Sequence, residues 1–217
     1  MVPKHVLTIW LNDDPVIPDH VVRWISTHQS VRGCTHHLMT LENYPKGIPY
    51  VERFIASKQW ARAADYLRIH YLHEQGGMYL DADVEVRLPF FEDLFTLLKE
   101  RDKPQLLCER EPNGFIANSF IMADAGHPML KDYMEHVVAN PIGRWDQGSE
   151  TFHMGVGAWT VLLQAAIEGH DRTVHVLFPD TMFAHRLKHH WLNSWCPTKR
   201  EDAFVQPSDL QTTQSPS

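Results

Sequence analysis

Two aspartates separated by one residue, Asp81 and Asp83, have the clearest chemical potential in this chain. The short apolar run 78–80 leads directly into them, which predicts that both carboxylates lie where a strand ends. If the backbone bends there, both can approach one hard divalent cation, and such a cation would neutralise a bound diphosphate. The spacing alone is weak evidence, because Asp-x-Asp also occurs in solvated turns. Its meaning therefore depends on the elements that position the pair.

A helix is predicted immediately before the pair. From Gln59 to Gln75 apolar residues recur at helical spacing, and Gly76-Gly77 ends the pattern. Asp65 and Arg68 lie one turn apart on this helix, so they can grip neighbouring hydroxyl groups of one sugar ring. The alternative is an ordinary ion pair on the helix surface. Donor-sugar binding is favoured, because the same helix leads into the acidic pair.

The helix and the acidic pair together carry a family resemblance. The runs 61–68 and 76–83 resemble the pattern A-x-x-S-D-x-L-R followed by G-G-x-Y-x-D-x-D, with Ala64 where serine is common. That pattern is typical of the DXD-containing sugar-binding region of GT-A glycosyltransferases, in the group that includes initiating α-mannosyltransferases and large clostridial glucosylating toxins. Three further segments are similar to that family, in the same order: Ile9-Trp10, Asn118-Ser119-Phe120 with Gly126-His127-Pro128, and His189-His190-Trp191-Leu192-Asn193-Ser194-Trp195.

The resemblance implies a reaction. A hexose would move from a nucleotide-diphosphate sugar, with UDP favoured, to a glycan or another hydroxyl acceptor, with retention of anomeric configuration. Mn²⁺ or Mg²⁺, held by the acidic pair, would be the cofactor of this transfer. Asp83 is the expected direct metal ligand and Asp81 is expected to reach the ribose, the sugar or the metal, so these two are the candidate catalytic residues.

Four further residues are candidates for donor binding. Tyr79 is expected to pack beside the donor, or else to be a core aromatic residue of the strand. Trp10 could stack on the nucleobase, with a buried core tryptophan as the equal alternative. Near the end of the chain, the Ser194 hydroxyl and the Trp195 indole N–H could donate to the diphosphate.

His189 and His190 are candidates to complete the metal shell, together with Asp81 and Asp83. A histidine ligand would favour Mn²⁺ over Mg²⁺, since a neutral imidazole suits manganese better. The alternative is a pair of exposed histidines. The sequence does not say which of the two would bind.

The acceptor side is less defined, because acceptor pockets use variable loops. The polar, aromatic and glycine-bearing segment 143–150 has the composition of a sugar-binding loop, although it could be an ordinary connection. The candidate acceptor residues are Asn118, Asp146, Glu150 and His153.

Composition limits the possible partners and compartment. The chain has 217 residues, a formal charge of −7 and no cluster of Lys and Arg, so nucleic-acid binding is not expected. It contains no run of about eighteen apolar residues that could span a bilayer. Its three cysteines are far apart and show no CxxC spacing. A cytoplasmic location is therefore predicted.

Strand and helix patterns alternate along the chain, which predicts a single GT-A, Rossmann-like α/β domain over residues 1–205. Its central sheet should be mixed, mainly parallel and flanked by helices. The polar stretch 206–217 is expected to be a disordered tail, or a linker in a longer multidomain protein. Strands are expected at 5–10, 34–41, 78–80, 106–109, 117–122 and 174–178, and the strand at 174–178 is expected to be the last. Helices are expected at 18–32, 59–75, 90–99, 128–138 and 157–167.

Two other functions compete with glycosyl transfer. A metal-dependent phosphohydrolase or nucleotidyltransferase also uses aspartates at strand ends, but it would need more acidic ligands than 81–85 supplies. A non-catalytic sugar- or metal-binding module would use the acidic pair only to hold an ion. The EF-hand form of that module is excluded, because the D-x-[DN]-x-[DN]-G spacing is absent.

Overall fold

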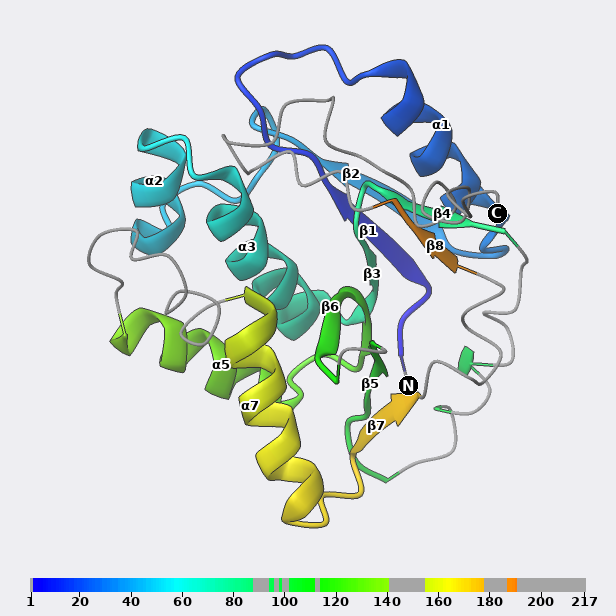
Figure 1. Ribbon diagram of the computed structural model, residues 1–217, viewed down its shortest axis with the longest axis vertical. Helices are drawn as coiled ribbons and strands as arrows, with labels where there is room; N and C mark the ends of the chain where they lie inside the picture. Colours follow the sequence, from blue (N-terminus) through cyan, green and yellow to red (C-terminus); the bar gives the residue numbers. More distant parts are fainter. Residues whose placement is uncertain are drawn as a thin grey trace, which may run out of the picture.

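The computed structural model describes residues 2–87, 94–95, 98, 102–111, 114–140, 155–177 and 187–190. Their centre is a six-stranded sheet in the order β2-β1-β3-β6-β5-β7 (Figure 1). Its strands are β1 (His5–Ile9), β2 (Thr35–Met39), β3 (Gly77–Leu80), β5 (Leu106–Arg110), β6 (Ile116–Ala123) and β7 (Val174–Leu177).

The sheet is mixed and mainly parallel, as predicted. β1 runs parallel to β2 and β3, and β5 runs parallel to β7, whereas β6 is antiparallel to both of its neighbours, β3 and β5. β6 is therefore the one reversed strand of this sheet. Since β1, β3 and β5 point the same way, their carboxyl ends meet at one edge, where ligands of open α/β sheets usually bind.

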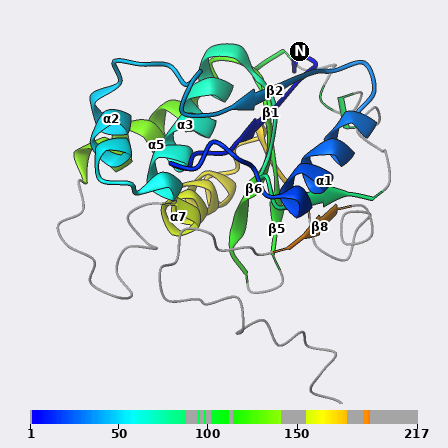
Figure 2. The same ribbon diagram turned by 90° about the horizontal axis from the view of Figure 1, so that it is seen from above.

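Helices cover both faces of the sheet (Figure 2). One face carries α2 (Pro49–Ala56), α3 (Trp60–Gln75), α5 (Pro128–Ala139) and α7 (Gly155–Glu168), and the other carries α1 (Asp19–Thr27), followed by the 3-10 turn η1 (His28–Ser30). Each face has its own apolar cluster. Leu7 of β1 packs on the side of the four helices, and the adjacent Val6 packs on the other side. This explains why β1 is apolar almost throughout, as strands buried on both faces are.

A small second sheet stands beside the first. It pairs β4 (Val84–Val86) with β8 (Leu187–His189) in antiparallel register, with Val84 opposite His189. Neither strand was expected, and Val174–Leu177 is therefore not the final strand. Three-residue strands give too short a pattern to be recognised in a sequence. The pairing matters for function, because it brings residue 189 beside the acidic pair.

Other predictions agree with the structure or lie outside what it describes. The helix expected at 59–75 is α3, and those at 128–138 and 157–167 are α5 and α7, each within two residues. The helix α2 was not anticipated. Most of the helix expected at 90–99, and all of the segment 206–217, lie outside the described residues.

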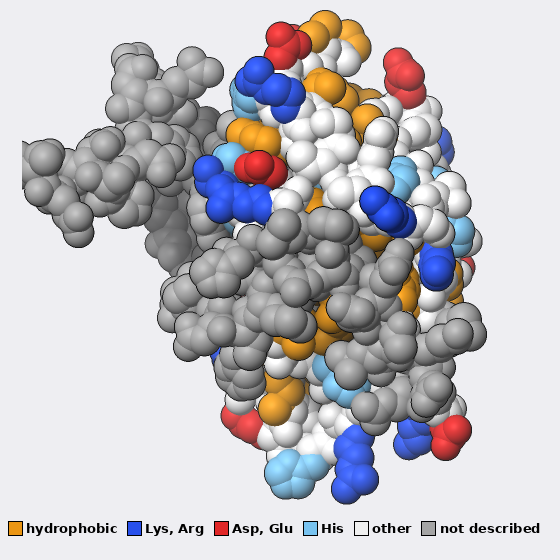
Figure 3. All heavy atoms as spheres, turned by 90° about the vertical axis from the view of Figure 1, so that its right-hand side faces the viewer, with side chains coloured by type: hydrophobic (Ala, Val, Ile, Leu, Met, Phe, Trp, Pro, Cys, Tyr) orange, Lys and Arg blue, Asp and Glu red, His pale blue; other side chains and the backbone are white. Residues whose placement is uncertain are grey.

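The surface and the helices can be described for part of the chain. On the face shown in Figure 3, basic and acidic side chains of the described residues lie interspersed and form no basic stripe. Among the helices that the structure describes, none is long and apolar enough to cross a membrane.

Candidate metal centre and donor site

Two glycines connect α3 to β3 and so fix where the acidic pair lies. Gly76 has φ +65°, and a Cβ there would lie 2.7 Å from Pro3 Cδ and 2.8 Å from the backbone nitrogen of Ala125. Gly77 has φ +108°, and a Cβ there would lie 2.9 Å from the His5 carbonyl oxygen. Both positions combine a left-handed backbone with close approach of another chain segment, which only glycine allows.

The chain bends at the acidic pair, as a shared cation site requires. β3 ends at Leu80, residues 82 and 83 form a turn, and the Val84 amide that opens β4 donates to the Asp81 carbonyl at 3.0 Å. The Asp81 amide donates to the Ser119 carbonyl of β6 at 2.9 Å. The two side chains are thereby released from strict strand alternation.

Asp81, Asp83 and His189 converge on one point. One potential ligand atom from each lies within 4.8 Å of the other two, and each side chain is partly buried. His189 Nε2 lies 3.2 Å from Asp83 Oδ1. Burial lowers the pKa of His189, but Asp83, Asp81 and Glu111 together raise it above its ordinary value. The three side chains make a compact site with the donor set of a divalent transition-metal ion.

His190 does not join this group, which corrects its place among the candidate ligands. Its Nε2 lies 2.8 Å from Glu85 Oε2, and its ring stacks on Trp24 at 4.0 Å between centroids. Successive residues of a strand point to opposite sides, so of the two neighbouring histidines only His189 faces the acidic pair.

Arg68 connects the predicted sugar-binding helix to the acidic pair. It donates through Nη1 to Asp81 Oδ1 at 3.0 Å and to the Asn118 carbonyl at 2.7 Å, and its Nη2 lies 2.9 Å from Asp65 Oδ1. Arg68 is only 6% exposed. The alternative of a helix-surface ion pair is therefore wrong, because Asp65 and Arg68 lie inside the site.

The carboxyl group of Asp65 has a raised pKa. Burial raises its pKa to about 6 and Asp81 adds to this, while Arg68 and the amide of Asn118 oppose it. The Asn118 Nδ2 donates to Asp65 Oδ1 at 3.0 Å. Asn118 was expected on the acceptor side, but its side chain belongs to the cluster formed by Asp65, Arg68 and Asp81. Its contacts are about 50 residues away in sequence, which local patterns do not reveal.

Tyr79 is a buried core residue that also contacts the acidic pair. It is 1% exposed, as a core residue would be, yet its hydroxyl donates to Asp81 Oδ1. The Arg68 guanidinium lies 4.6 Å from the centre of its ring, within cation–π range. Trp10 follows β1 at the same sheet edge and is partly buried, and its indole Nε1 has no hydrogen-bond partner among the described residues.

The remaining candidates lie outside the described residues. These are Ser194 and Trp195 on the donor side, and Asp146, Glu150 and His153 on the acceptor side.

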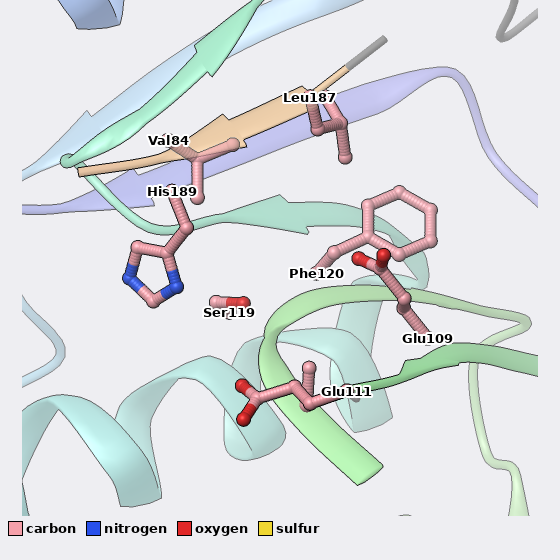
Figure 4. A pocket seen from close by; sticks show the side chains of 8 residues that line it. Val84, Glu109, Glu111, Ser119, Phe120, Leu187 and His189 are labelled. Carbon is pink, nitrogen blue, oxygen red and sulfur yellow. The ribbon is translucent and has the colours of Figure 1, made fainter. Parts of the chain in front are cut away.

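Sequence reasoning missed a cavity of about 110 Å³ beside the metal centre. Its polar lining consists of Glu109, Glu111, Ser119 and His189 (Figure 4). Burial, together with the nearby Glu111, raises the pKa of Glu109 to about 7, and His189 opposes this. A signal was present, because Glu109 and Glu111 stand at the carboxyl end of a predicted strand, as the acidic pair does.

Comparison with known proteins agrees with this geometry. Residues 17–101, which contain Asp65, Arg68 and the acidic pair, match the family described as glycosyltransferase sugar-binding region containing DXD motif. No curated protein matches the sequence significantly.

Among the solved structures that resemble this chain, one shares its fold with a TM-score above 0.5. One named PaToxG Glycosyltransferase is 18% identical, with 78% of this chain and 72% of that chain aligned and a TM-score of 0.59. A glycosyltransferase involved in glycosylation of the major capsid of PBCV-1 is 13% identical, covering 86% and 94%, with a TM-score of 0.45. The apo-form glycosyltransferase GlyE of Streptococcus pneumoniae TIGR4 is 14% identical, covering 82% and 46%, with a TM-score of 0.46. Residues 17–101 of this chain are therefore similar to the DXD-containing sugar-binding region of glycosyltransferases, and the chain shares its GT-A-like fold with a solved glycosyltransferase.

Proposed function

We propose that this chain transfers a hexose from a nucleotide-diphosphate sugar, with UDP as the favoured nucleotide, to a hydroxyl group of a glycan or another acceptor. The observation that carries the proposal is the convergence of Asp81, Asp83 and His189 next to the buried Arg68 cluster. The first group suits a cation that binds a diphosphate, and the second offers charged hydrogen-bonding groups to the attached sugar. Such a pair of adjoining sites is what a nucleotide-sugar requires.

The residues present fit a divalent cation. Two carboxylates and one imidazole favour Mn²⁺, although Mg²⁺ also accepts carboxylate oxygens. Asp83 and His189 are the proposed direct ligands, with Asp81 binding directly or through water. When bound, the cation would neutralise the charge that develops on the departing diphosphate.

The chain's own residues would position the donor sugar. Arg68 holds Asp65 and Asp81 in fixed orientations, which reduces the cost of ordering them when a ligand binds. The Asp65 oxygen Oδ2 faces Gly155, at the start of α7, where an added Cβ would lie 3.1 Å from it. A side chain at position 155 would crowd this oxygen, so glycine allows α7 to begin close to the Asp65 carboxylate. Trp10, Ser194 and Trp195 remain proposed contacts for the nucleobase and the diphosphate.

Thermal unfolding with a panel of nucleotide-sugars tests the proposal. With Mn²⁺ present, a UDP-sugar should raise the unfolding temperature, because a ligand that binds only the folded state stabilises it. Asp83→Ala should abolish the increase. Asp132→Ala, at an exposed position of α5, is the matched control and should retain it. Absence of any response in the wild-type protein, or an undiminished response in Asp83→Ala, would refute the proposal.

Turnover separates this function from its rivals. A transferase should release UDP rapidly only when an acceptor is added, whereas a phosphohydrolase would need none and a binding module would release none. The anomeric configuration of the product, read by NMR, tests the proposed retention. Acceptor contacts from Asp146, Glu150 and His153, a cytoplasmic location and a domain spanning 1–205 also remain proposals.

A further inference from the structure

The small second sheet needs support from outside itself. β4 and β8 have three residues each, and within the described part of the chain they pair only with each other. A two-stranded ribbon of this length is marginally stable on its own. Its register nevertheless decides whether the ligand atoms of the candidate metal centre meet. Val84 lies opposite His189, and the His190 amide donates to the Asp83 carbonyl at 2.9 Å. Whatever holds β4 in place therefore also holds Asp83 and His189 together.

Two side chains at the junction of α1 and η1 contact the outer edge of β4, which lies beside α1 in Figure 1. His28 Nε2 donates to the Val84 carbonyl at 2.7 Å, and the Val86 amide donates to Thr27 Oγ1 at 2.8 Å. Backbone groups of alternate strand residues point to the same side, so these two groups point away from β8. The Asp83 carbonyl points towards β8. The side chains of Thr27 and His28 thus satisfy the edge of β4 that a third strand would otherwise occupy.

His28 is fixed from its other side by the central sheet. Since the Val84 carbonyl can only accept, Nε2 of the neutral ring carries the proton, and Nδ1 accepts from the Thr8 hydroxyl of β1 at 2.9 Å. His28 is 2% exposed and Thr8 is 3% exposed. An imidazole with both nitrogens engaged has a single orientation. The ring therefore links β1 to β4, and so sets where the small sheet lies relative to the central sheet from which Asp81 comes.

A second buried histidine shows what a purely structural role looks like. His127 is 0% exposed, and its Nδ1 accepts from the Met129 amide at the start of α5, at 3.3 Å. It follows the end of β6 that lies beside the start of β3, where Gly77 pairs with Ala123. Asp81 follows the opposite end of β3. His127 is therefore a matched control for His28, because it supports a helix at the far edge of the sheet.

We propose that His28 and Thr27 are positioning residues of the candidate metal centre. They hold the backbone of β4 so that Asp83 and His189 present their ligand atoms beside Asp81 before a cation arrives. Neither residue touches the cation. Ligands that are already oriented bind a cation more tightly, because less order has to be imposed on binding. The effect on a cation rests on the proposed function, whereas the placement of β4 by His28 does not.

Mn²⁺ affinity, measured from the electron paramagnetic resonance signal of the free ion, tests the effect on the metal centre. His28→Leu should bind Mn²⁺ about tenfold or more weakly, since residues that orient metal ligands contribute about 10–100-fold to affinity. His28→Gln keeps a donor that reaches the Val84 carbonyl, so its affinity should return to within about threefold of wild type. His127→Leu should keep the wild-type affinity. Urea unfolding measures the stability that each variant loses.

Hydrogen exchange in the metal-free protein tests the placement of β4 directly. In His28→Leu the His190 amide, which donates to the Asp83 carbonyl, should exchange faster relative to global unfolding than it does in His127→Leu. If His28→Leu does not fold, Thr27→Val supports the same two measurements, because it removes only the acceptor for the Val86 amide. It should weaken Mn²⁺ binding about fivefold, and Thr27→Ser should restore it.

Several results would overturn the proposal. These are wild-type Mn²⁺ affinity in a folded His28→Leu variant, an equal loss in His127→Leu, or no recovery in His28→Gln. Unchanged exchange of the His190 amide in His28→Leu would refute the placement of β4, even if Mn²⁺ binding weakened. Failure of the proposed function has a different signature, because the wild-type protein itself would then bind no Mn²⁺. The exchange measurement would still decide whether His28 places β4.

Discussion

Arg68 shows at the scale of a residue how the proposed donor site is held before any ligand arrives. One guanidinium contacts two carboxylates and a backbone carbonyl, which come from α3, from the end of β3 and from β6. Burying a charge costs free energy unless it is paired and hydrogen-bonded. The acceptors that pair with the Arg68 guanidinium belong to the same cluster of residues. The arrangement keeps Asp65 and Asp81 close despite their mutual repulsion.

Replacing Arg68 with Met should destabilise the fold by about 3–5 kcal/mol, because two partly buried carboxylates lose their counter-ion. It should also abolish stabilisation by a nucleotide-sugar. Denaturant unfolding measures the first effect. Arg23→Met, on the exposed side of α1, should change the free energy of unfolding by less than about 0.5 kcal/mol. A loss in Arg68→Met no larger than in this control would mean that the cluster is not structural.

Residue spacing made part of this site predictable. Asp65, Arg68, Tyr79 and the acidic pair are near one another in sequence, so a helix followed by a strand was enough to bring them together. The contact of Asn118 with Asp65 was not anticipated, because Asp65 lies on α3 and only the tertiary pairing of β3 with β6 brings Asn118 close to it. Glu109 and Glu111 were missed although they stand at the end of a predicted strand, and only the tertiary structure shows that they share a cavity with His189.

At the scale of elements, short connections decide the geometry. β1, β3 and β5 were expected because buried strands give continuous apolar runs, whereas β4 and β8 acquire strand geometry only from each other. Their pairing could not be read from either segment alone, yet it selects His189 over His190.

Position 76, between α3 and β3, should tolerate no side chain. In Gly76→Ala, left-handed strain of about 1–2 kcal/mol adds to overpacking of about 1–3 kcal/mol against Pro3 and Ala125. Gly47→Ala shares a positive φ, at +83°, but has nothing within 4 Å of the added Cβ, so it should show only the strain of a positive φ. Thermal unfolding of the two variants compares them. Equal losses would show that Gly76 is needed for its dihedral angle alone.

His28 ties η1 to β4 and should make stability depend on pH. Its Nε2 donates to the Val84 carbonyl at 2.7 Å, so its Nδ1 accepts from the Thr8 hydroxyl at 2.9 Å and the ring is neutral. Burial lowers its pKa from 6.5 to about 4. Between pH 6.5 and pH 4 the unfolded chain binds a proton at His28 that the folded protein does not bind. The contribution of His28 to the free energy of unfolding is therefore complete above pH 6.5 and falls as the pH is lowered towards 4.

The loss attributable to His28 should reach on the order of 3 kcal/mol at pH 4, from a depression of about two and a half pKa units. Urea unfolding measured between pH 7 and pH 4 gives this slope. His28→Gln should be less stable at pH 7 but flatter across the range, while the exposed His170→Asn should keep the wild-type slope. An unchanged slope in His28→Gln would assign the acid sensitivity to other groups.

At the scale of the whole molecule, the candidate metal centre joins distant parts of the chain. Asp81 and Asp83 follow directly after β3 of the central sheet, whereas His189 belongs to β8, about a hundred residues later in the chain. A cation that binds all three therefore cross-links the two sheets, and its free energy of binding contributes to the stability of β8.

Mn²⁺ should slow hydrogen exchange of the β8 amides and raise the unfolding temperature, and EDTA should reverse both changes. His189→Ala should lose about tenfold or more in Mn²⁺ affinity and lose the protection of β8. His190→Ala should keep Mn²⁺ affinity within about twofold, because its imidazole pairs with Glu85 instead. Equal effects of the two substitutions would contradict the assignment of His189.

The alternation of side chains along β6 has a consequence for how substrate preference can diversify. Asn118 and Ser119 are consecutive, yet one contacts Asp65 and the other lines the cavity beside His189. Inserting or deleting one residue here would exchange the two directions and damage both sites together. New specificities on this scaffold should therefore arise by substitution within a fixed length of β6, while changes in loop length accumulate elsewhere.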